Sequence, residues 1–331
     1  MLEHGGRLRE AARRWGIPLA DWLDLSTGIS PWPYPLPPPP DEVWQRLPED
    51  DDGLEAAARD YYGTPGAAGL LALPGSQAAI QWLPRLVPAG RVALAPPLYA
   101  EHPAAWRAAG HEVVAWEEPA DYAVVCNPNN PTGECHARAA LLDRARSLRL
   151  LLVDEAFIDA EPAESLAGLA GTGAAENIIV LRSLGKFFGL AGARVGFAIA
   201  APPLLGALRE AIGPWAVTHP GRWAARHALA DRAWQAAQRQ RLGTAALRLD
   251  ALLRKVMRSG IPGDGFGDTA GTVLFRYVAV PQAVEIHDTL ARAGVLVRCF
   301  DQPAALRFGL PATEPDWQRL ADALKEIACV A

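Results

Sequence analysis

The residue best suited to covalent chemistry is a lysine in a chain that has almost none. The 331-residue sequence has 32 basic residues, and only Lys186, Lys255 and Lys325 are lysines. Arginine does not lose its proton near neutral pH, so a lysine retained against this bias can mark a position that needs an amine able to do so. Lys186 lies in Ser183-Leu-Gly-Lys-Phe-Phe-Gly, where small and apolar neighbours are expected to lower its pKa and make it nucleophilic. The alternative is a surface lysine in a loop.

A carboxylate follows an apolar run in Leu151-Leu-Val-Asp154. A strand here would leave Asp154 largely buried, and a buried carboxylate is costly unless a cation or a strong donor pairs with it. Asp154 is therefore a candidate for charge stabilisation. The alternative is a cap on the following segment.

Three other segments have groups that could hold a ligand. Pro74-Gly-Ser-Gln77 begins a helical pattern, whose N–H groups and Ser76 hydroxyl can bind a phosphate, although most such turns are only helix caps. Cys126-Asn-Pro-Asn-Asn-Pro-Thr-Gly133 is a rigid turn that either presents fixed amides or only connects two elements. Arg194, eight residues after Lys186, could neutralise a phosphate.

Apolar runs that alternate with helical patterns must position these groups. We expect strands at 69–73, 91–95, 112–115, 123–126, 150–153, 178–181 and 195–199, and helices at 54–62, 76–86, 101–109 and 137–147. Continuously apolar strands separated by helices indicate an α/β fold with a mostly parallel sheet covered on both faces. The candidate residues follow the strands, where open α/β sheets bind ligands.

The rest of the chain has a different pattern. A long helix at about 222–257 precedes expected strands at 272–278, 295–298 and 305–308 and helices at 282–293 and 316–328. This arrangement is typical of a smaller α+β domain. Residues 24–40 have too many prolines for a helix or a central strand. We therefore expect an irregular arm at 1–40, a large domain at 41–205 and a small domain at 206–331.

Composition excludes several classes of protein. Half of the chain is hydrophobic, which is enough for a sizeable core, and the net charge is −5 with a pI near 5.8. No Lys/Arg-rich run suggests a nucleic-acid or anionic-membrane partner, and no apolar stretch approaches a membrane span. No signal peptide is visible, and four scattered cysteines suggest reduced thiols in a cytoplasmic protein. We expect no metal site.

Together, the four segments resemble fold-type I pyridoxal-phosphate (PLP) enzymes of the aminotransferase superfamily. The resemblance covers nearly the whole chain and implies a large PLP-binding domain with a smaller C-terminal substrate domain. It implies that Lys186 forms the imine with the cofactor and that Asp154 keeps the pyridine nitrogen protonated, so that the ring accepts electrons. Asn130 would contact the phenolic oxygen, and Tyr99 would stack on the ring as a further catalytic residue. The cofactor phosphate would be held by Ser76, Gln77, Ser183 and Arg194.

One position departs from the pattern. Many aminotransferases have Asp-Glu-Ala-Tyr, whose tyrosine also contacts the phenolic oxygen, whereas this chain has Phe157. Phenylalanine cannot donate a hydrogen bond, so the cofactor would depend more on Asn130 and Asp154. The departure weakens the case for transamination without excluding it.

Two groups within the superfamily fit best. The start, His4-Gly5-Gly6, and the motif Asp-Glu-Ala-Phe resemble the threonine-phosphate decarboxylases of cobalamin biosynthesis more than the histidinol-phosphate aminotransferases. The resemblance implies that Arg307 holds the substrate α-carboxylate and that His4, Gly5, Gly6 and Arg298 help to bind its phosphate. Without it, His4 would be a disordered terminal residue and Arg298 a surface residue.

The resemblance also implies a homodimer that takes a small phosphorylated amino acid. The two groups differ in reaction, decarboxylation or transamination, and the difference is not readable from the sequence. A regulatory protein that retains the fold is a third alternative. It is less favoured because both the lysine and the aspartate are present.

Overall fold

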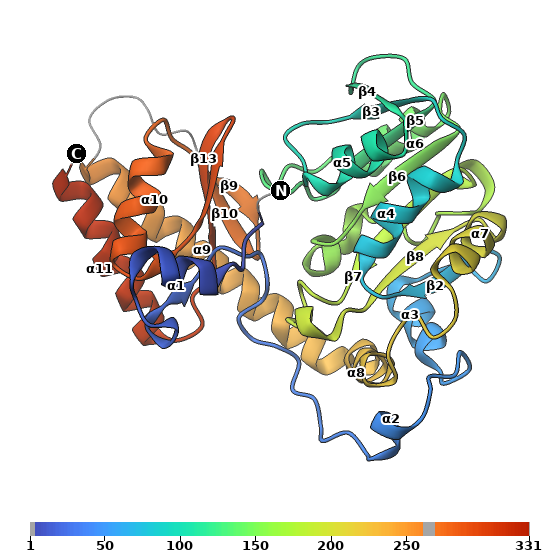
Figure 1. The fold of residues 1–331 in the computed structure, drawn as a ribbon, viewed down its shortest axis with the longest axis horizontal. Coiled ribbons are helices and arrows are strands. Elements are labelled where there is room, and N and C mark those ends of the chain that lie inside the picture. The colour runs from blue at the N-terminus through green and yellow to red at the C-terminus, as the bar shows by residue number, and fades with distance from the viewer. Residues whose placement is uncertain (1–3, 261–268, 331) are drawn as a thin grey trace. The chain divides into compact units, whose positions relative to one another are not determined.

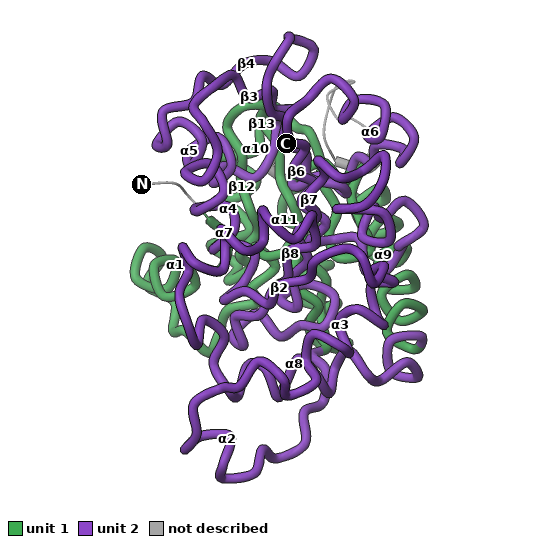
Figure 2. The backbone as a smooth tube through the Cα atoms, turned by 90° about the vertical axis from the view of Figure 1, so that its right-hand side faces the viewer, with its two compact units in different colours: residues 1–32, 131–133, 237–331 green, residues 33–130, 134–236 purple. Residues whose placement is uncertain are grey.

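The structure is a computed structural model and describes residues 4–260 and 269–330. The chain forms two compact units (Figure 2). The smaller comprises Met1–Trp32, Pro131–Gly133 and Ala237–Ala331, and the larger comprises Pro33–Asn130 and Glu134–Ala236. Residues 33–40 and 206–236 thus belong to the larger unit, which differs from the division expected from sequence.

The larger unit is built on a seven-stranded sheet of order β2-β8-β7-β6-β5-β3-β4 (Figure 1). Neighbouring strands run parallel except at β8, which is antiparallel to β2 and β7. The predicted α/β class with a mostly parallel sheet is confirmed. The strands are β2 (Gly69–Leu73), β3 (Arg91–Leu94), β4 (Glu112–Ala115), β5 (Tyr122–Cys126), β6 (Leu150–Asp154), β7 (Ile178–Ser183) and β8 (Gly196–Ala200).

Helices α4 (Ser76–Leu86), α5 (Glu101–Ala108) and α7 (Pro202–Ile212) bury apolar side chains against one face of this sheet. Strand residues alternate between faces, so Leu181 joins that core while Arg182 lies on the other face, over the ring of Tyr62 in α3 (Leu54–Tyr62). Shorter helices are α2 (Glu42–Gln45), α6 (Arg138–Ala145) and four 3₁₀ turns, η2 (Ile158–Ala160), η3 (Pro162–Glu164), η4 (Gly173–Ala175) and η5 (Ala191–Ala193).

The prediction of one long helix at 222–257 is wrong. This stretch is divided into α8 (His219–Ala230) and α9 (Arg232–Gly260) at Asp231. The Asp231 carboxylate accepts from the Trp234 backbone N–H (2.9 Å), and the Gln235 side chain donates to the last carbonyls of α8. Asp231 is therefore an N-cap, which begins a new helix despite the continuous helical composition.

The smaller unit has a four-stranded antiparallel sheet of order β12-β13-β10-β9. Its strands are β9 (Ala270–Thr272), β10 (Phe275–Ala279), β12 (Arg298–Asp301) and β13 (Ala304–Gly309), and its helices include α10 (Ala283–Arg292) and α11 (Glu314–Val330). The single strand expected at 272–278 is a hairpin instead. The Thr272 hydroxyl accepts from the Leu274 N–H (3.1 Å), which stabilises the tight turn.

We expect an irregular arm at residues 1–40 from the sequence, but part of this segment is regular. It includes α1 (Leu8–Trp15), the 3₁₀ turn η1 (Leu19–Asp21) and β1 (Leu23–Asp24), which pairs with β11 (Val295–Leu296). Leu8, Ala11, Ala12 and Trp15 have the i, i+3, i+4, i+7 spacing of a helix face and pack with Trp22 and Ala291. Within the described ranges, no helix combines the length and apolar character needed to cross a bilayer.

Candidate active site

The strand order of the larger unit brings most of the predicted cofactor residues to one sheet edge. Asp154 ends β6, and its register partners are Cys126 of β5 and Leu181 of β7. Gly196, at the start of β8, pairs with both Leu73 and Ser183. The turn after β2 therefore lies beside the end of β7, although more than a hundred residues separate them in sequence.

Asp154 is buried and has a partner that the sequence analysis missed. Its Oδ2 lies 3.0 Å from Nε2 of His102, which is wholly buried, and its Oδ1 accepts from the Ala156 N–H (3.1 Å). The other ring nitrogen of His102, Nδ1, is a buried atom with no hydrogen-bond partner. His102 lies in the first turn of α5, three residues after the predicted Tyr99, and this closeness in sequence is the signal that could have identified it.

A cradle for a phosphate is formed at the start of α4. Gly75 has φ +79°, and a Cβ built on it would lie 2.8 Å from a guanidinium nitrogen of Arg194. A Cβ on Gly196 would lie 2.5 Å from the Ser76 backbone nitrogen. Both glycines leave the helix N-terminus open beside Arg194, which suits a phosphate. Ser183 is brought to the same place by its pairing with Gly196.

Tyr99 and Gln77 are joined to each other. The Tyr99 hydroxyl donates to Oε1 of Gln77 (3.3 Å), and Nε2 of Gln77 donates to Glu101 (2.9 Å). Burial, with the nearby charges of Glu101 and Asp154, raises the pKa of Tyr99 to about 12, so its hydroxyl is neutral at physiological pH. With its side chain engaged in this way, Gln77 can still offer its backbone N–H to the phosphate cradle.

Lys186 follows β7 in a loop anchored by aromatic residues. Phe187 and Phe188 are buried, and their rings lie 5.8 and 5.7 Å from the ring of Trp234. Nζ of Lys186 lies 5.4 Å from the centroid of Phe157. The position that departs from the aminotransferase pattern is therefore in contact with the predicted catalytic amine.

The asparagine-rich turn is closed by its own side chains. Asn127 exchanges hydrogen bonds with the backbone of His136 (2.8 and 3.1 Å), and the Asn129 side chain donates to the Pro97 carbonyl (2.7 Å). Asn127 and Asn129 are buried, and Asn130 is half-buried. Asn130 is thus the asparagine of this turn most accessible to a ligand.

A buried ion group that the sequence analysis did not predict lies on the other face of the sheet. Arg182 contacts Glu155 (2.9 Å) and Asp159 (2.6 Å), and all three side chains are almost completely buried. Burial raises the pKa of the Glu155 carboxyl, although the guanidinium and the Ser165 hydroxyl oppose the change. The pair of Glu155 and Arg182 therefore connects the segments that contain Asp154 and Ser183.

The smaller unit brings together the predicted substrate residues. Arg307 of β13 is the register partner of Arg298 of β12, so two cationic side chains lie side by side. Arg307 is buried and donates to the Ser26 carbonyl (3.0 Å), while the Ser26 hydroxyl accepts from the Gly6 N–H (2.7 Å). A Cβ on Gly5 would lie 2.2 Å from the Ser26 carbonyl oxygen, so only glycine fits there. Ser26, which we had not predicted, links the His4-Gly5-Gly6 segment to Arg307.

The structure has two other features that could hold a ligand. His102, Cys126 and Asp154 place three potential metal-ligand atoms within 4.8 Å of one another. However, burial and the Asp154 charge raise the pKa of the Cys126 thiol, which opposes thiolate formation, and Asp154 is already paired with His102. We assign no metal to this group.

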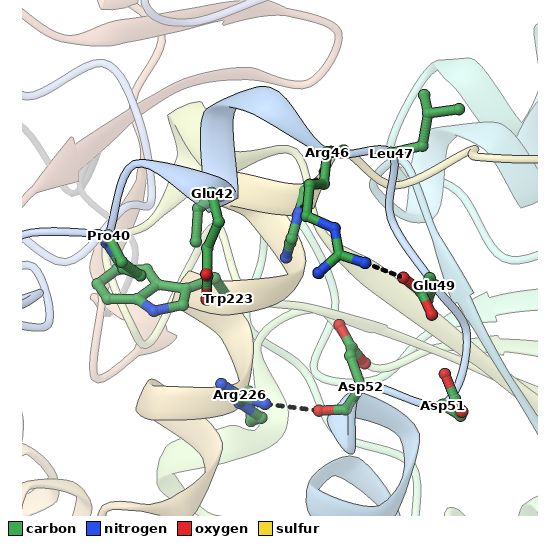
Figure 3. Close-up of a pocket in the computed structure, with 11 residues that line it drawn as sticks. Pro40, Glu42, Arg46, Leu47, Glu49, Asp51, Asp52, Trp223 and Arg226 are labelled. Atoms are coloured by element: carbon green, nitrogen blue, oxygen red, sulfur yellow. Dashed lines mark hydrogen bonds and ion pairs between the residues drawn. The ribbon is translucent and has the colours of Figure 1, made fainter.

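A hollow of about 300 Å³ lies between α2 and the start of α8 (Figure 3) and contains none of the predicted site residues. Its cations are engaged, since Arg46 pairs with Glu49 (3.3 Å) and Arg226 donates to the Asp52 carbonyl (2.6 Å). Acidic and basic groups are mixed in its lining, so the hollow indicates no class of ligand.

The fold and the sheet-edge site together define the class of protein: the chain belongs to the family Aminotransferase class I and II, whose profile matches residues 47–324. It is 54% identical to a threonine-phosphate decarboxylase of Pseudomonas aeruginosa, over 98% of this chain and 97% of that protein. It is 42% identical to a threonine-phosphate decarboxylase of Sinorhizobium sp., with the same coverage. The fold is also that of a histidinol-phosphate aminotransferase from Sinorhizobium meliloti solved with pyridoxal-5'-phosphate, with a TM-score of 0.80, 20% identity and coverage of 99% and 96%.

Proposed function

We propose that the protein is a PLP-dependent decarboxylase that converts L-threonine O-3-phosphate to (R)-1-amino-2-propanol O-2-phosphate and CO₂ in cobalamin biosynthesis. The observation that carries the proposal is the presence of two separate anion sites. The cradle of Ser76, Ser183 and Arg194 suits the cofactor phosphate, and the paired Arg298 and Arg307 suit a substrate with two anionic groups. The two threonine-phosphate decarboxylases that match over almost the full chain support the same substrate.

The larger unit would bind and orient the cofactor. Asp154, held by His102, would pair with the pyridine nitrogen, and Asn130 would donate to the phenolic oxygen. Tyr99 would lie against the ring with its hydroxyl fixed by Gln77. Bound PLP supplies an electron sink for the pair of electrons released at the substrate Cα.

The residues around the substrate would decide which bond breaks. Arg307 would hold the α-carboxylate, and Arg298 with the His4-Gly5-Gly6 segment would hold the phosphate. Held in this way, the substrate would present its Cα–carboxylate bond for cleavage with release of CO₂, for which bound PLP would accept the electron pair. Nζ of Lys186 would then deliver a proton to Cα, which completes the amine product.

The alternative is a histidinol-phosphate aminotransferase. Histidinol phosphate has no carboxylate, but its amino-group acceptor 2-oxoglutarate has two, so the arginine pair fits either reaction. The difference between the two reactions lies at Phe157, which lacks the hydroxyl that many aminotransferases place at the phenolic oxygen. Its contact with Lys186 puts this difference beside the predicted proton carrier.

The deciding measurement is CO₂ release from threonine phosphate without an added keto acid. We expect release by the PLP-loaded enzyme, with the aminopropanol phosphate formed in equal amount. Lys186→Ala should abolish both the release and the trapping of PLP on the protein by borohydride. A strict requirement for 2-oxoglutarate would overturn the proposal in favour of the aminotransferase.

We further propose that the protein is a cytoplasmic homodimer. Trp44 and Leu47, in and just after α2, are 68% and 62% exposed, which is unusual for large apolar side chains in a monomer. In the described chain Cys126, Cys135 and Cys299 are thiols rather than disulfides, as expected in a reducing compartment.

A further inference from the structure

One buried serine of the smaller unit holds both the N-terminal segment and an arginine of the predicted substrate site. The Ser26 hydroxyl accepts from the Gly6 N–H (2.7 Å), and the Ser26 carbonyl accepts from the Arg307 guanidinium (3.0 Å). Ser26 is 2% exposed, so protein groups rather than water set its position. The two bonds use different atoms, so the hydroxyl can be removed while the carbonyl still binds Arg307.

The direction of the Ser26 hydroxyl is set by Asp24. Oδ1 of Asp24 accepts from the Ser26 hydroxyl (2.6 Å) and from the Ser26 backbone N–H (2.9 Å). A hydroxyl has one proton, and an ionised carboxylate can only accept. Because the proton of Ser26 is donated to Asp24, the oxygen of Ser26 is left to accept from Gly6. Bonds to an ionised group are also the stronger ones, which favours this direction.

The turn that contains Ser26 is bonded to two strands close to the arginine pair. Leu25 donates its N–H to the Leu296 carbonyl (2.7 Å) at the end of β11, and its carbonyl accepts from the Gly309 N–H (2.7 Å) at the end of β13. These strand ends lie two residues from Arg298 and from Arg307 in the sequence. Hydrogen bonds therefore fix the turn relative to both cations.

The backbones in this region are in direct contact. A Cβ built on Gly5 would lie 2.2 Å from the Ser26 carbonyl oxygen, and one built on Gly309 would lie 2.5 Å from the Thr27 carbonyl oxygen. The N-terminal segment thus lies directly against the turn, and the turn lies directly against the end of β13. No side chain separates the segment from the strand that carries the buried arginine.

We propose that Asp24 and Ser26 are positioning residues for the substrate: they hold the His4-Gly5-Gly6 segment against the turn that binds Arg307, and so increase the affinity of this site for a phosphate group. Neither residue has to touch the substrate. The inference rests on the proposed function in assigning the segment and the arginine pair to the substrate. It does not depend on which bond at Cα breaks.

Titration of the PLP-loaded enzyme with inorganic phosphate tests the proposal. We expect Ser26→Ala and Asp24→Ala each to weaken phosphate binding by about fivefold or more, because the segment loses its acceptor or the direction of that acceptor. Asp24→Asn should remain within about twofold, since its amide oxygen can accept both bonds. The matched control is Thr313→Ala, which removes a similar hydroxyl bond to a carboxylate, that of Asp316 (2.8 Å), in the same unit and should bind phosphate normally.

Three further readouts separate positioning from a general loss of stability. The KM for threonine phosphate should rise with the phosphate dissociation constant while kcat stays within about twofold, as expected when binding alone is weakened. Deuterium uptake by the N-terminal peptide should be faster in Ser26→Ala and in Asp24→Ala, because the Gly6 N–H loses its acceptor. The double variant should bind phosphate about as weakly as the weaker single variant, since both residues act through one hydroxyl.

Unchanged phosphate affinity in Ser26→Ala, or additive losses in the double variant, would overturn the proposal. If either alanine variant fails to fold, Ser26→Cys replaces it: sulfur is a weaker acceptor, and phosphate binding should weaken in the same direction. Unaltered enzyme that binds phosphate through this segment but releases no CO₂ from threonine phosphate would refute the proposed function alone. Failure of the unaltered PLP-loaded enzyme to bind phosphate would overturn both.

Discussion

Arg307 is a buried cation whose surroundings favour an anion. Burial in the first place, and then the charge of the adjacent Arg298, lower the pKa of its guanidinium to about 10. The Ser26 carbonyl provides one hydrogen bond but no negative charge. Two adjacent cations, one of them buried, repel each other, and an anion bound between them would reduce that repulsion.

This arrangement predicts that the affinity of the PLP-loaded enzyme for phosphate falls at alkaline pH. Arg307 is protonated below its pKa and loses its charge as the pH rises through about 10. Calorimetric titration with inorganic phosphate between pH 8 and 11 should therefore show affinity falling near pH 10. Arg298→Gln should bind phosphate more weakly at pH 8, yet its loss of affinity should begin at higher pH, because one cause of the lowered pKa is removed. Identical pH profiles would contradict a coupling of the two arginines.

At the level of elements, a buried ion group joins β6 to β7. Glu155 follows the last residue of β6, and Arg182 precedes the last residue of β7, so their contact holds Asp154 and Ser183 in a fixed relation. Asp159 in η2 pairs with the same guanidinium. The neighbouring carboxylates raise the pKa of Arg182 despite its burial, so it remains charged.

Arg182→Met should therefore destabilise the larger unit strongly. The change leaves two buried carboxylates without their cation, a situation that typically costs about 3–5 kcal/mol. A urea titration followed by fluorescence should show a lower midpoint than that of the unaltered protein. Arg146→Met, which removes an exposed pair with Asp143, is the control and should leave the midpoint nearly unchanged. Equal midpoints for the two variants would contradict the structural role of Arg182.

At the scale of the whole molecule, exposed apolar side chains support the proposed homodimer. Trp44 lies in α2 of the larger unit, and Leu47, which lines the hollow in Figure 3, follows that helix by two residues. Leu247 in α9 is 70% exposed but is an isolated apolar position. Neighbouring apolar side chains indicate an interface more strongly than an isolated one does.

The double variant Trp44→Arg/Leu47→Arg should shift the protein from dimer to monomer. Charged side chains at the centre of an apolar interface would have to be desolvated without a partner. Sedimentation velocity over a range of protein concentrations measures the shift, and Leu247→Arg is the control expected to remain dimeric. An unaltered protein that sediments as a fully active monomer would contradict the homodimer.

The sequence by itself determined the class of fold and most of the residues proposed for the cofactor. Apolar runs such as Leu150–Asp154 and Ile178–Ser183 are local signals, and strand burial depends on them directly. Lys186 and Asp154 were conspicuous because Lys186 is the only lysine among the first 254 residues and a carboxylate directly after a buried strand is rare. Helix α1 could also have been predicted, since its apolar spacing is local.

Only the tertiary structure decided which groups meet. The insertion of β8 between β2 and β7, which brings Gly75 and Arg194 together, depends on strand pairing across long sequence separations. The contact of His102 with Asp154 and the pairing of Cys126 with Asp154 depend on the same long-range arrangement of strands. Periodicity records which side of an element is buried but not what is buried against it, so these partners could not be predicted from the chain alone.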